Sequence, residues 1–284
     1  ARQVVVHSPA LHLDGSVGGG RNQLDPINGI GLAHRRLAIL DLSPAGGQPM
    51  ASASGRYILA FNGEIYNHRL IRQDLERRGN LIAPWRGHSD TETLLAGFDN
   101  WGVVATLKRT IGMFAIALWD RELRTLTLAR DRLGEKPLYY GWQGQGQRAT
   151  FLFGSELSAL QRHPMFSPEI NRDALALYMR HNCIGGDNSI YSGIKKLLPG
   201  HLLTVSRAIP EPVLSTWWSG ADVAAEGVAK PFVGSPEEAV TALEILLHDA
   251  IGQQMMADVP LGAFLSGGLD SSTVVALMQA QSNR

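Results

Sequence analysis

Short apolar runs separated by turn residues dominate the sequence from Arg56 to Leu160. Asp120-Arg121 and Gly134-Glu135-Lys136-Pro137 stand between such runs, and turn residues in these places are typical of antiparallel strands. The pattern therefore predicts antiparallel strands at Tyr57 to Phe61, Met113 to Trp119, Thr125 to Ala129, Leu138 to Trp142 and Phe151 to Gly154.

Two helical patterns interrupt these strands. The first runs from about Asn67 to Arg78 and stops at Gly79, a residue suited to the left-handed conformation that follows a helix. The second begins with Ser89-Asp90-Thr91-Glu92, where the serine and the glutamate can each bond a main-chain amide of the first turn. Its apolar positions follow at helical spacing, at Leu94, Leu95, Phe98 and Trp101. Helices and strands in this order predict layered α+β packing.

The pattern changes near the carboxyl end of the chain. Ser235-Pro236-Glu237-Glu238 predicts the start of a long helix. Val259 to Leu265 is a nearly continuous apolar run, which predicts a strand buried on both faces of a parallel sheet, and the apolar residues after it predict another helix. Because about 50 residues of such a unit cannot cover both faces of their own sheet, we expect the chain to stop inside a second, α/β domain.

The composition limits the class of protein. The chain has 284 residues, of which 44% are hydrophobic and 18% charged, so we expect a packed core and two domains. Its 26 basic and 26 acidic residues argue against a general binder of nucleic acid or acidic membranes. The single cysteine, Cys183, excludes an intrachain disulfide and favours a reducing compartment.

Membrane segments and metal ligands are not predicted. No apolar run approaches the roughly 20 residues that cross a bilayer, and the start lacks the apolar segment of a secretory signal. We therefore expect a cytoplasmic protein. The nine histidines show no spacing typical of zinc ligands, so we predict no metal site.

The most specific local motif is the glycine turn between the predicted strand and the last predicted helix. It reads Leu265-Ser266-Gly267-Gly268-Leu269-Asp270-Ser271-Ser272. Glycines let main-chain amides approach an anion closely, while the helix start and the serine hydroxyls add donors for phosphate. The motif lacks the Gly-Lys-Ser/Thr of a P-loop. These residues predict a nucleotide or pyrophosphate site, and the alternative is an ordinary glycine turn with a serine cap.

This motif resembles the pyrophosphatase loop of ATP-dependent amide-forming enzymes, especially glutamine-dependent asparagine synthetases. Other stretches resemble that family in its order, and the similarity runs from about Gly31 to Ala280. They are Ala33-His34-Arg35-Arg36-Leu37-Ala38-Ile39-Leu40-Asp41, Phe61-Asn62-Gly63-Glu64-Ile65-Tyr66-Asn67, Ser89-Asp90-Thr91-Glu92, Gly112-Met113-Phe114-Ala115, Arg130-Asp131-Arg132-Leu133-Gly134-Glu135-Lys136-Pro137-Leu138-Tyr139-Tyr140, Gly154-Ser155-Glu156 and Leu198-Pro199-Gly200-His201.

The resemblance implies two domains and one overall reaction. Residues 1–205 are expected to form a layered αββα N-terminal-nucleophile hydrolase domain, including a joining segment, that frees ammonia from glutamine. Residues 206–284 are expected to form a linker and the start of an α/β ATP-pyrophosphatase domain. The implied activity is that of an asparagine synthase (glutamine-hydrolysing), an ATP-dependent carbon-nitrogen ligase of asparagine biosynthesis.

The implied ligands are glutamine, ATP with Mg²⁺, and aspartate or a similar carboxylate acceptor. A homodimer is allowed, and neither nucleic acid nor a membrane is an expected partner.

The resemblance also implies roles for single residues. Arg36 pairs with the α-carboxylate of glutamine, as its two-pronged donor geometry allows. Leu37, Ala38, Ile39 and Leu40 line the same pocket. The Asn62 side-chain nitrogen and the Gly63 amide form an oxyanion hole, and Glu64 and Asp90 hold the α-ammonium or nearby polar groups. The ATP-binding residues are Leu265, Ser266, Gly267, Gly268, Leu269, Asp270, Ser271 and Ser272.

Each of these residues also fits a simpler interpretation. Arg36 fits a surface arginine, and Asn62-Gly63 is a strong signal for a hairpin turn. Asp90 in the first turn of a helix stabilises the helix dipole without any ligand.

The nucleophile of the family is a cysteine at the mature amino terminus, whereas residue 1 here is Ala1. The family's Cys-Gly-Ile opening and its Arg-Gly-Pro-Asp segment are missing too, through truncation or divergence. Cys183 lies far beyond the hydrolase motifs and is not a candidate. We therefore expect the chain as written to hydrolyse no glutamine. Two alternatives stay open, which are a β-lactam synthetase-like cyclising enzyme with an inactive hydrolase scaffold and a silent glutamine-binding module.

Overall fold

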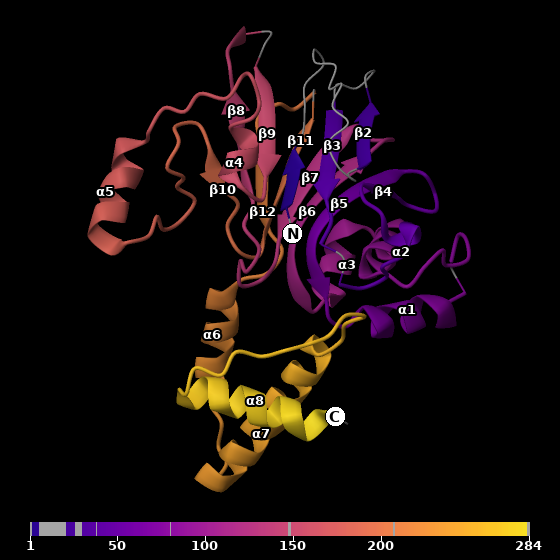
Figure 1. Cartoon of the computed structure of the whole chain (residues 1–284), viewed down its shortest axis with the longest axis vertical. Helices are drawn as coiled ribbons and strands as arrows, with labels where there is room; N and C mark the ends of the chain where they lie inside the picture. Colours follow the sequence, from indigo (N-terminus) through magenta and orange to yellow (C-terminus); the bar gives the residue numbers. More distant parts are fainter. Residues whose placement is uncertain are drawn as a thin grey trace. The chain divides into compact units, whose positions relative to one another are not determined.

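A computed structural model describes residues 2–5, 21–25, 30–37, 39–79, 81–146, 149–206 and 208–282, and these fall into two units (Figure 1). The first unit runs to Gly220 without the short segment Ile39–Leu42, and the second contains that segment and the residues from Ala221 onward. The structure thus divides the chain after Gly220, whereas the boundary predicted from the sequence lies after residue 205.

The elements of the first unit alternate between strands and short helices. They are β1 (Arg2–Val5), β2 (Arg21–Asp25), β3 (Ile30–Arg35), the 3₁₀ turn η1 (Pro44–Gly46), β4 (Met50–Ala51), β5 (Tyr57–Ile65), α1 (His68–Arg77), α2 (Asp90–Trp101), α3 (Val103–Arg109), β6 (Gly112–Asp120), β7 (Thr125–Arg130), β8 (Tyr139–Gln143), β9 (Thr150–Gly154), α4 (Leu157–Leu160), α5 (Arg172–His181), β10 (Lys195–Lys196), β11 (His201–Ser206) and β12 (Val213–Thr216). The five strands predicted between Arg56 and Leu160 are confirmed as β5 to β9.

The largest sheet has six strands in the order β12-β11-β7-β6-β5-β4, and every neighbouring pair is antiparallel. Its centre is the pair β5 and β6, which run in register from Tyr57 opposite Asp120 to Ile65 opposite Gly112. Two smaller sheets, β1-β3-β2 and β10-β8-β9, complete the strand layers.

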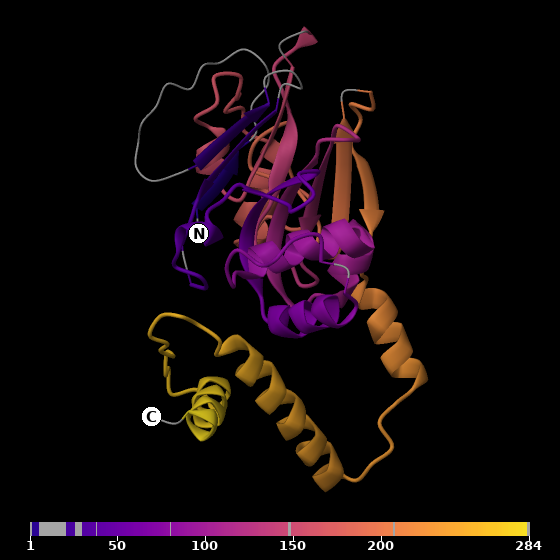
Figure 2. The same ribbon diagram turned by 90° about the vertical axis from the view of Figure 1, so that its right-hand side faces the viewer.

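The side chains of β5 point alternately to the two faces of the sheet, and the two faces border different layers of the first unit. Ile58 and Ala60 face one way and join the core that also holds Phe153 of β9. Leu59 and Phe61 face the other way and pack in a second core with residues of α2 such as Phe98. Figures 1 and 2 show α1, α2 and α3 on one side of the strands, with α4 on the other side. The predicted layered α+β fold is confirmed. Its layers are the helices α1 to α3, the six-stranded sheet, the two smaller sheets and the helix α4, in that order.

Helix starts follow the signals in the sequence. The Ser89 hydroxyl accepts the Glu92 amide at 3.3 Å, so α2 begins where it was predicted. The reciprocal bond from Glu92 to the cap is replaced by bonds to the preceding loop, described below. In α7 (Pro236–Gln254) both halves of the capping box are formed, by Ser235 and Glu238.

Asp131 organises the loop between β7 and β8. Its carboxylate is fully buried and accepts four main-chain amides, those of Phe114 at 3.1 Å, Leu133 at 3.1 Å, Glu135 at 2.9 Å and Lys136 at 3.0 Å. The motif that begins with Arg130-Asp131 therefore closes this loop against β6. It has a structural role that its sequence alone does not reveal.

The second unit contains α6 (Gly220–Ala229) apart from its first residue, α7 (Pro236–Gln254), α8 (Leu269–Gln281) and connecting segments. The strand predicted over Val259 to Leu265 is wrong, because these residues form no ladder and Phe264 is fully exposed. A strand needs a neighbour to complete its hydrogen bonds, and none of the described residues of this unit (39–42 and 221–282) is in a strand.

Within the described ranges, no helix combines the length and apolar character that crossing a bilayer requires.

We predict that Asp131→Asn lowers the free energy of unfolding by about 3 kcal/mol, because an amide cannot accept all the buried N–H groups that the carboxylate accepts. Urea denaturation measures the change. Asp74→Asn is the matched control, since Asp74 pairs with the exposed Arg77 and Arg78 at the end of α1, and the loss of these pairs costs about 0.5 kcal/mol or less. Equal unfolding midpoints for the two variants would contradict this role of Asp131.

Candidate functional site

The carboxyl end of β5 carries three of the predicted site residues, Asn62, Gly63 and Glu64. Asn62 and Gly63 lie opposite Ala115 and Phe114 inside the strand, so the alternative that Asn-Gly forms a turn is wrong. The Asn62 side chain continues the row of Ile58 and Ala60 toward the smaller sheets and is 5% exposed.

Gly63 permits the close approach of β5 to β6. A Cβ at this position would lie 2.0 Å from the Met113 carbonyl oxygen and 2.7 Å from the Phe114 Cα. The Phe114 amide and carbonyl both bond Asp131, on the far side of β6. Gly63 and Phe114 are therefore a non-hydrogen-bonded pair, and the Gly63 amide points to the opposite edge of β5.

Side chains from two other segments bond this edge of β5. The Phe61 amide donates to Gln48 Oε1 at 2.7 Å, and the Ile65 amide donates to Asp90 Oδ2 at 3.0 Å. The Gly63 amide points the same way, between these two, because amide directions alternate along a strand. Gln48 also donates to the Thr91 hydroxyl at 3.2 Å, which ties this edge to α2. No local pattern in the sequence marks Gln48, so it was not among the predicted site residues.

Asp90 joins helix α2 to strand β5. Its other carboxylate oxygen accepts the Thr91 amide at 2.8 Å, and the side chain is buried. The pKa of Asp90 is raised to about 6, mainly by burial and also by the nearby charge of Glu64, while the hydrogen bonds from Ile65 and Thr91 lower it. A cation beside Asp90 would stabilise its ionised form.

Glu64 lies on the same face of β5 as Asn62 and is half-buried. Burial raises the pKa of the Glu64 carboxyl, and the positive charge of Lys136 opposes that change. Burial also raises the pKa of the Tyr66 hydroxyl, helped by the charges of Glu135 and Glu64. The end of β5 is thus an acidic region in which positive charge is favourable.

Arg36 follows β3 and is half-buried. Its Nη1 donates to the Ser43 carbonyl at 3.4 Å, and a Cβ on Gly46 would lie 2.3 Å from its guanidinium. His34, two residues earlier, hydrogen-bonds the Phe61 backbone, and burial lowers the pKa of His34 to about 4. That bond brings the end of β3 beside the part of β5 that carries Asn62.

Of the other residues expected in the glutamine pocket, the structure describes Leu37, Ile39 and Leu40. Leu37 is 64% exposed. Ile39 and Leu40 belong to the second unit, where the Asp258 amide donates to the Ile39 carbonyl at 3.0 Å. Ala38 lies outside the described residues.

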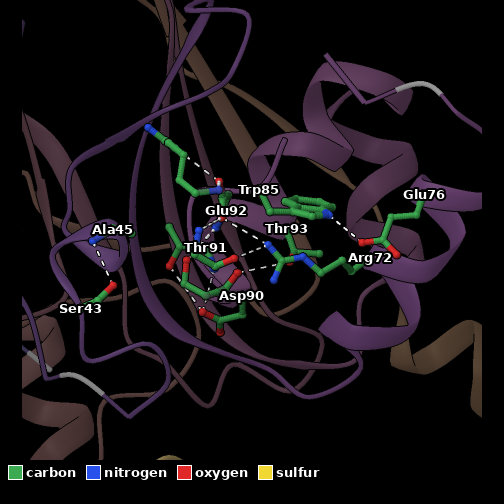
Figure 3. A network of polar contacts seen from close by, with 12 residues as sticks. Ser43, Ala45, Arg72, Glu76, Trp85, Asp90, Thr91, Glu92 and Thr93 are labelled. Atoms are coloured by element: carbon green, nitrogen blue, oxygen red, sulfur yellow. Dashed lines mark hydrogen bonds and ion pairs between the residues drawn. The ribbon is translucent and has the colours of Figure 1, made fainter. Parts of the chain in front are cut away.

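A network of polar contacts holds the loop before α2 (Figure 3). Glu92 accepts the amides of Arg86 at 2.8 Å and Gly87 at 3.1 Å, and it pairs with Arg72 at 3.3 Å. The Arg72 guanidinium lies 3.8 Å from the ring centre of Trp85. The network fixes the start of α2, and with it the position of Asp90.

The predicted phosphate loop precedes α8 in the second unit. Gly267 has a φ of 80°, a conformation that favours glycine, and α8 begins directly after Gly268. The hydroxyls of Ser271 and Ser272 donate to the Gly268 carbonyl at 3.1 and 2.8 Å. Residues Leu261 to Asp270 are all exposed. Among the described residues, no three His, Cys, Asp or Glu side chains are grouped to hold a metal ion.

Comparison with known proteins identifies the class. Residues 19–218, more than half of the chain, match the glutamine amidotransferase domain family. The chain belongs to this family. Residues 242–284 match a second family, described as asparagine synthase.

The similar curated proteins include two asparagine synthetases. The glutamine-hydrolysing asparagine synthetase 3 of Bacillus subtilis is 35% identical over 249 residues, which is 86% of this chain and 37% of that protein. A putative asparagine synthetase (glutamine-hydrolysing) 2 of Methanocaldococcus jannaschii is 35% identical over 266 residues, covering 88% of this chain and 48% of that protein. The chain thus spans between about a third and a half of these relatives.

Solved structures resemble the chain more distantly. A glutamine phosphoribosylpyrophosphate amidotransferase from B. subtilis gives a TM-score of 0.47 at 18% identity, covering 68% of this chain and 36% of that one. A glutamine aminotransferase class-II domain protein from Silicibacter pomeroyi gives 0.45 at 15% identity, covering 76% and 99%.

We predict that Gly63→Ala lowers the free energy of unfolding by about 3 kcal/mol or more, because its methyl group overlaps the backbone of β6. Gly185→Ala is the control, since a Cβ there meets no atom within 4 Å. Urea denaturation compares the two variants. A Gly63→Ala protein as stable as the control would show that β5 and β6 do not approach as described.

Proposed function

We propose that the first unit binds glutamine at the carboxyl end of β5, as part of a glutamine-hydrolysing asparagine synthetase. The observation that carries the proposal is the grouping of a buried amide side chain, a main-chain amide and two carboxyl groups of raised pKa at one strand end. The similarity to asparagine synthetases over 86% and 88% of the chain supports it.

The charges suit the two ends of an amino acid. We assign the α-ammonium of glutamine to Glu64 and Asp90, because a bound cation offsets the burial of their charges. Arg36 is assigned to the α-carboxylate, which its planar guanidinium can hold with two hydrogen bonds. The His34 bond to the Phe61 backbone supports the proximity of Arg36 to the strand end.

The side-chain amide of glutamine is assigned to the donors of β5. Asn62 Nδ2 and the Gly63 amide would bind its carbonyl oxygen and stabilise the negative charge that grows there during acyl transfer. Cys183 is exposed and follows α5, so we give it no part in this step.

In the second unit, we propose ATP with Mg²⁺ as the ligand of Leu265 to Ser272. The main-chain amides at the start of α8 and the nearby serine hydroxyls are donors that suit phosphate oxygens. In the larger enzyme this ligand would activate aspartate or a similar carboxylate for attack by ammonia. We also propose a cytoplasmic location, where the exposed thiol of Cys183 would stay reduced.

We predict that the chain binds L-glutamine and that Arg36→Lys weakens binding at least about tenfold, because lysine keeps the charge but cannot form the bidentate pair. Isothermal titration calorimetry measures both affinities. Arg35→Lys is the matched control, since Arg35 is exposed at the end of β3. A wild-type chain without affinity for glutamine would refute the proposed function, and equal affinities for the Arg36 and Arg35 variants would remove Arg36 from the pocket.

We predict that glutamine affinity falls as the pH is lowered through about 6, the raised pKa of Asp90. Protonation neutralises the carboxylate, and the ammonium group then loses its partner, so affinity is full above this pKa and lost below it. Titrations between pH 8 and pH 5 follow the change. In Asp90→Asn the fall near pH 6 should disappear and binding should be weaker throughout. An unchanged pH profile in that variant would show that another group titrates.

A further inference from the structure

Two rows of side chains meet between the sheets and end in a polar pair. On β5, the row of Ile58 and Ala60 that faces the core between the sheets continues with Asn62. On β9, Phe153 faces the same core, and Ser155 comes two residues later, directly after the end of the strand. Asn62 Nδ2 donates to Ser155 Oγ at 2.9 Å. This contact is the polar end of an otherwise apolar core.

The burial of this pair makes the hydrogen bond important for the orientation of Asn62. Asn62 is 5% exposed and Ser155 is 3% exposed. Among the described residues, the Asn62 Oδ1 atom has no hydrogen-bond partner. The amide plane is therefore held through its nitrogen, because buried polar groups keep the orientation in which they are paired.

We propose that Ser155 is a positioning residue, which holds the Asn62 amide so that its second N–H faces the side-chain carbonyl of bound glutamine. This inference rests on the proposed function. An amide nitrogen has two N–H donors in one plane, so a bond from one of them to Ser155 fixes the direction of the other. Gly154, the residue before Ser155, pairs with Tyr139 across β8 and β9, which anchors the serine to the smaller sheet.

Two ligands separate the carbonyl contact from the rest of the pocket. L-Norvaline keeps the α-ammonium, the α-carboxylate and the three-carbon side chain of glutamine but has no amide. We expect Ser155→Ala to weaken L-glutamine binding about tenfold and to leave L-norvaline binding unchanged. Ser158→Ala is the matched control, because Ser158 is exposed and bonds the nearby Glu156 carboxylate. Ser155→Thr, which keeps the hydroxyl, should restore most of the affinity.

A double-mutant cycle tests whether Ser155 acts through Asn62. Ser155→Ala should have no further effect on glutamine binding in an Asn62→Ala background, because the group that it positions is gone. Additive losses would overturn the inference, as would equal weakening of norvaline and glutamine. If the wild-type chain binds no glutamine, the proposed function fails. If it binds glutamine and Ser155→Ala binds it equally well, only the role of Ser155 fails.

Discussion

Strands β5 and β6 pair along nine residues, and at Gly63 their backbones approach so closely that a methyl group would overlap the Met113 carbonyl. This contact sets the register of the central pair, and the register sets which residues of β5 face the smaller sheets. A shift by one residue would move Asn62 and Glu64 to the face of the helices. The candidate site therefore depends on a close backbone contact between two strands.

Buried polar groups form a second level of organisation around that pair. Asp131 collects main-chain amides on the β7 side of β6, while Gln48 and Asp90 collect them on the open edge of β5. Such carboxylates and amides replace strand partners where the ladder stops. They order the part of β5 that lies beyond its pairing with β4.

Periodicity in the sequence predicted the strands β5 to β9 and the helices α1, α2, α7 and α8, because these strands alternate faces and α2 and α7 carry caps at Ser89 and Ser235. It failed where pairing between distant residues decides the outcome. Asn62-Gly63 has the local pattern of a turn but is extended because it pairs with β6. The apolar run before α8 pairs with no strand among the described residues, and it is therefore not a strand itself. The arrangement of Gln48 and Ser155 around Asn62 depends on contacts across separate segments, so no spacing along the chain indicates it.

Asp90 is used twice in this fold. It accepts the Ile65 amide and the Thr91 amide, and so fastens α2 to β5 whether or not a ligand is present. An acidic residue at this position in a related sequence is therefore a poor marker of glutamine binding, since selection for a stable fold alone would retain it. Arg36, to which we assign the α-carboxylate through a bidentate pair that lysine cannot form, is the more informative position for recognising relatives that bind an amino acid.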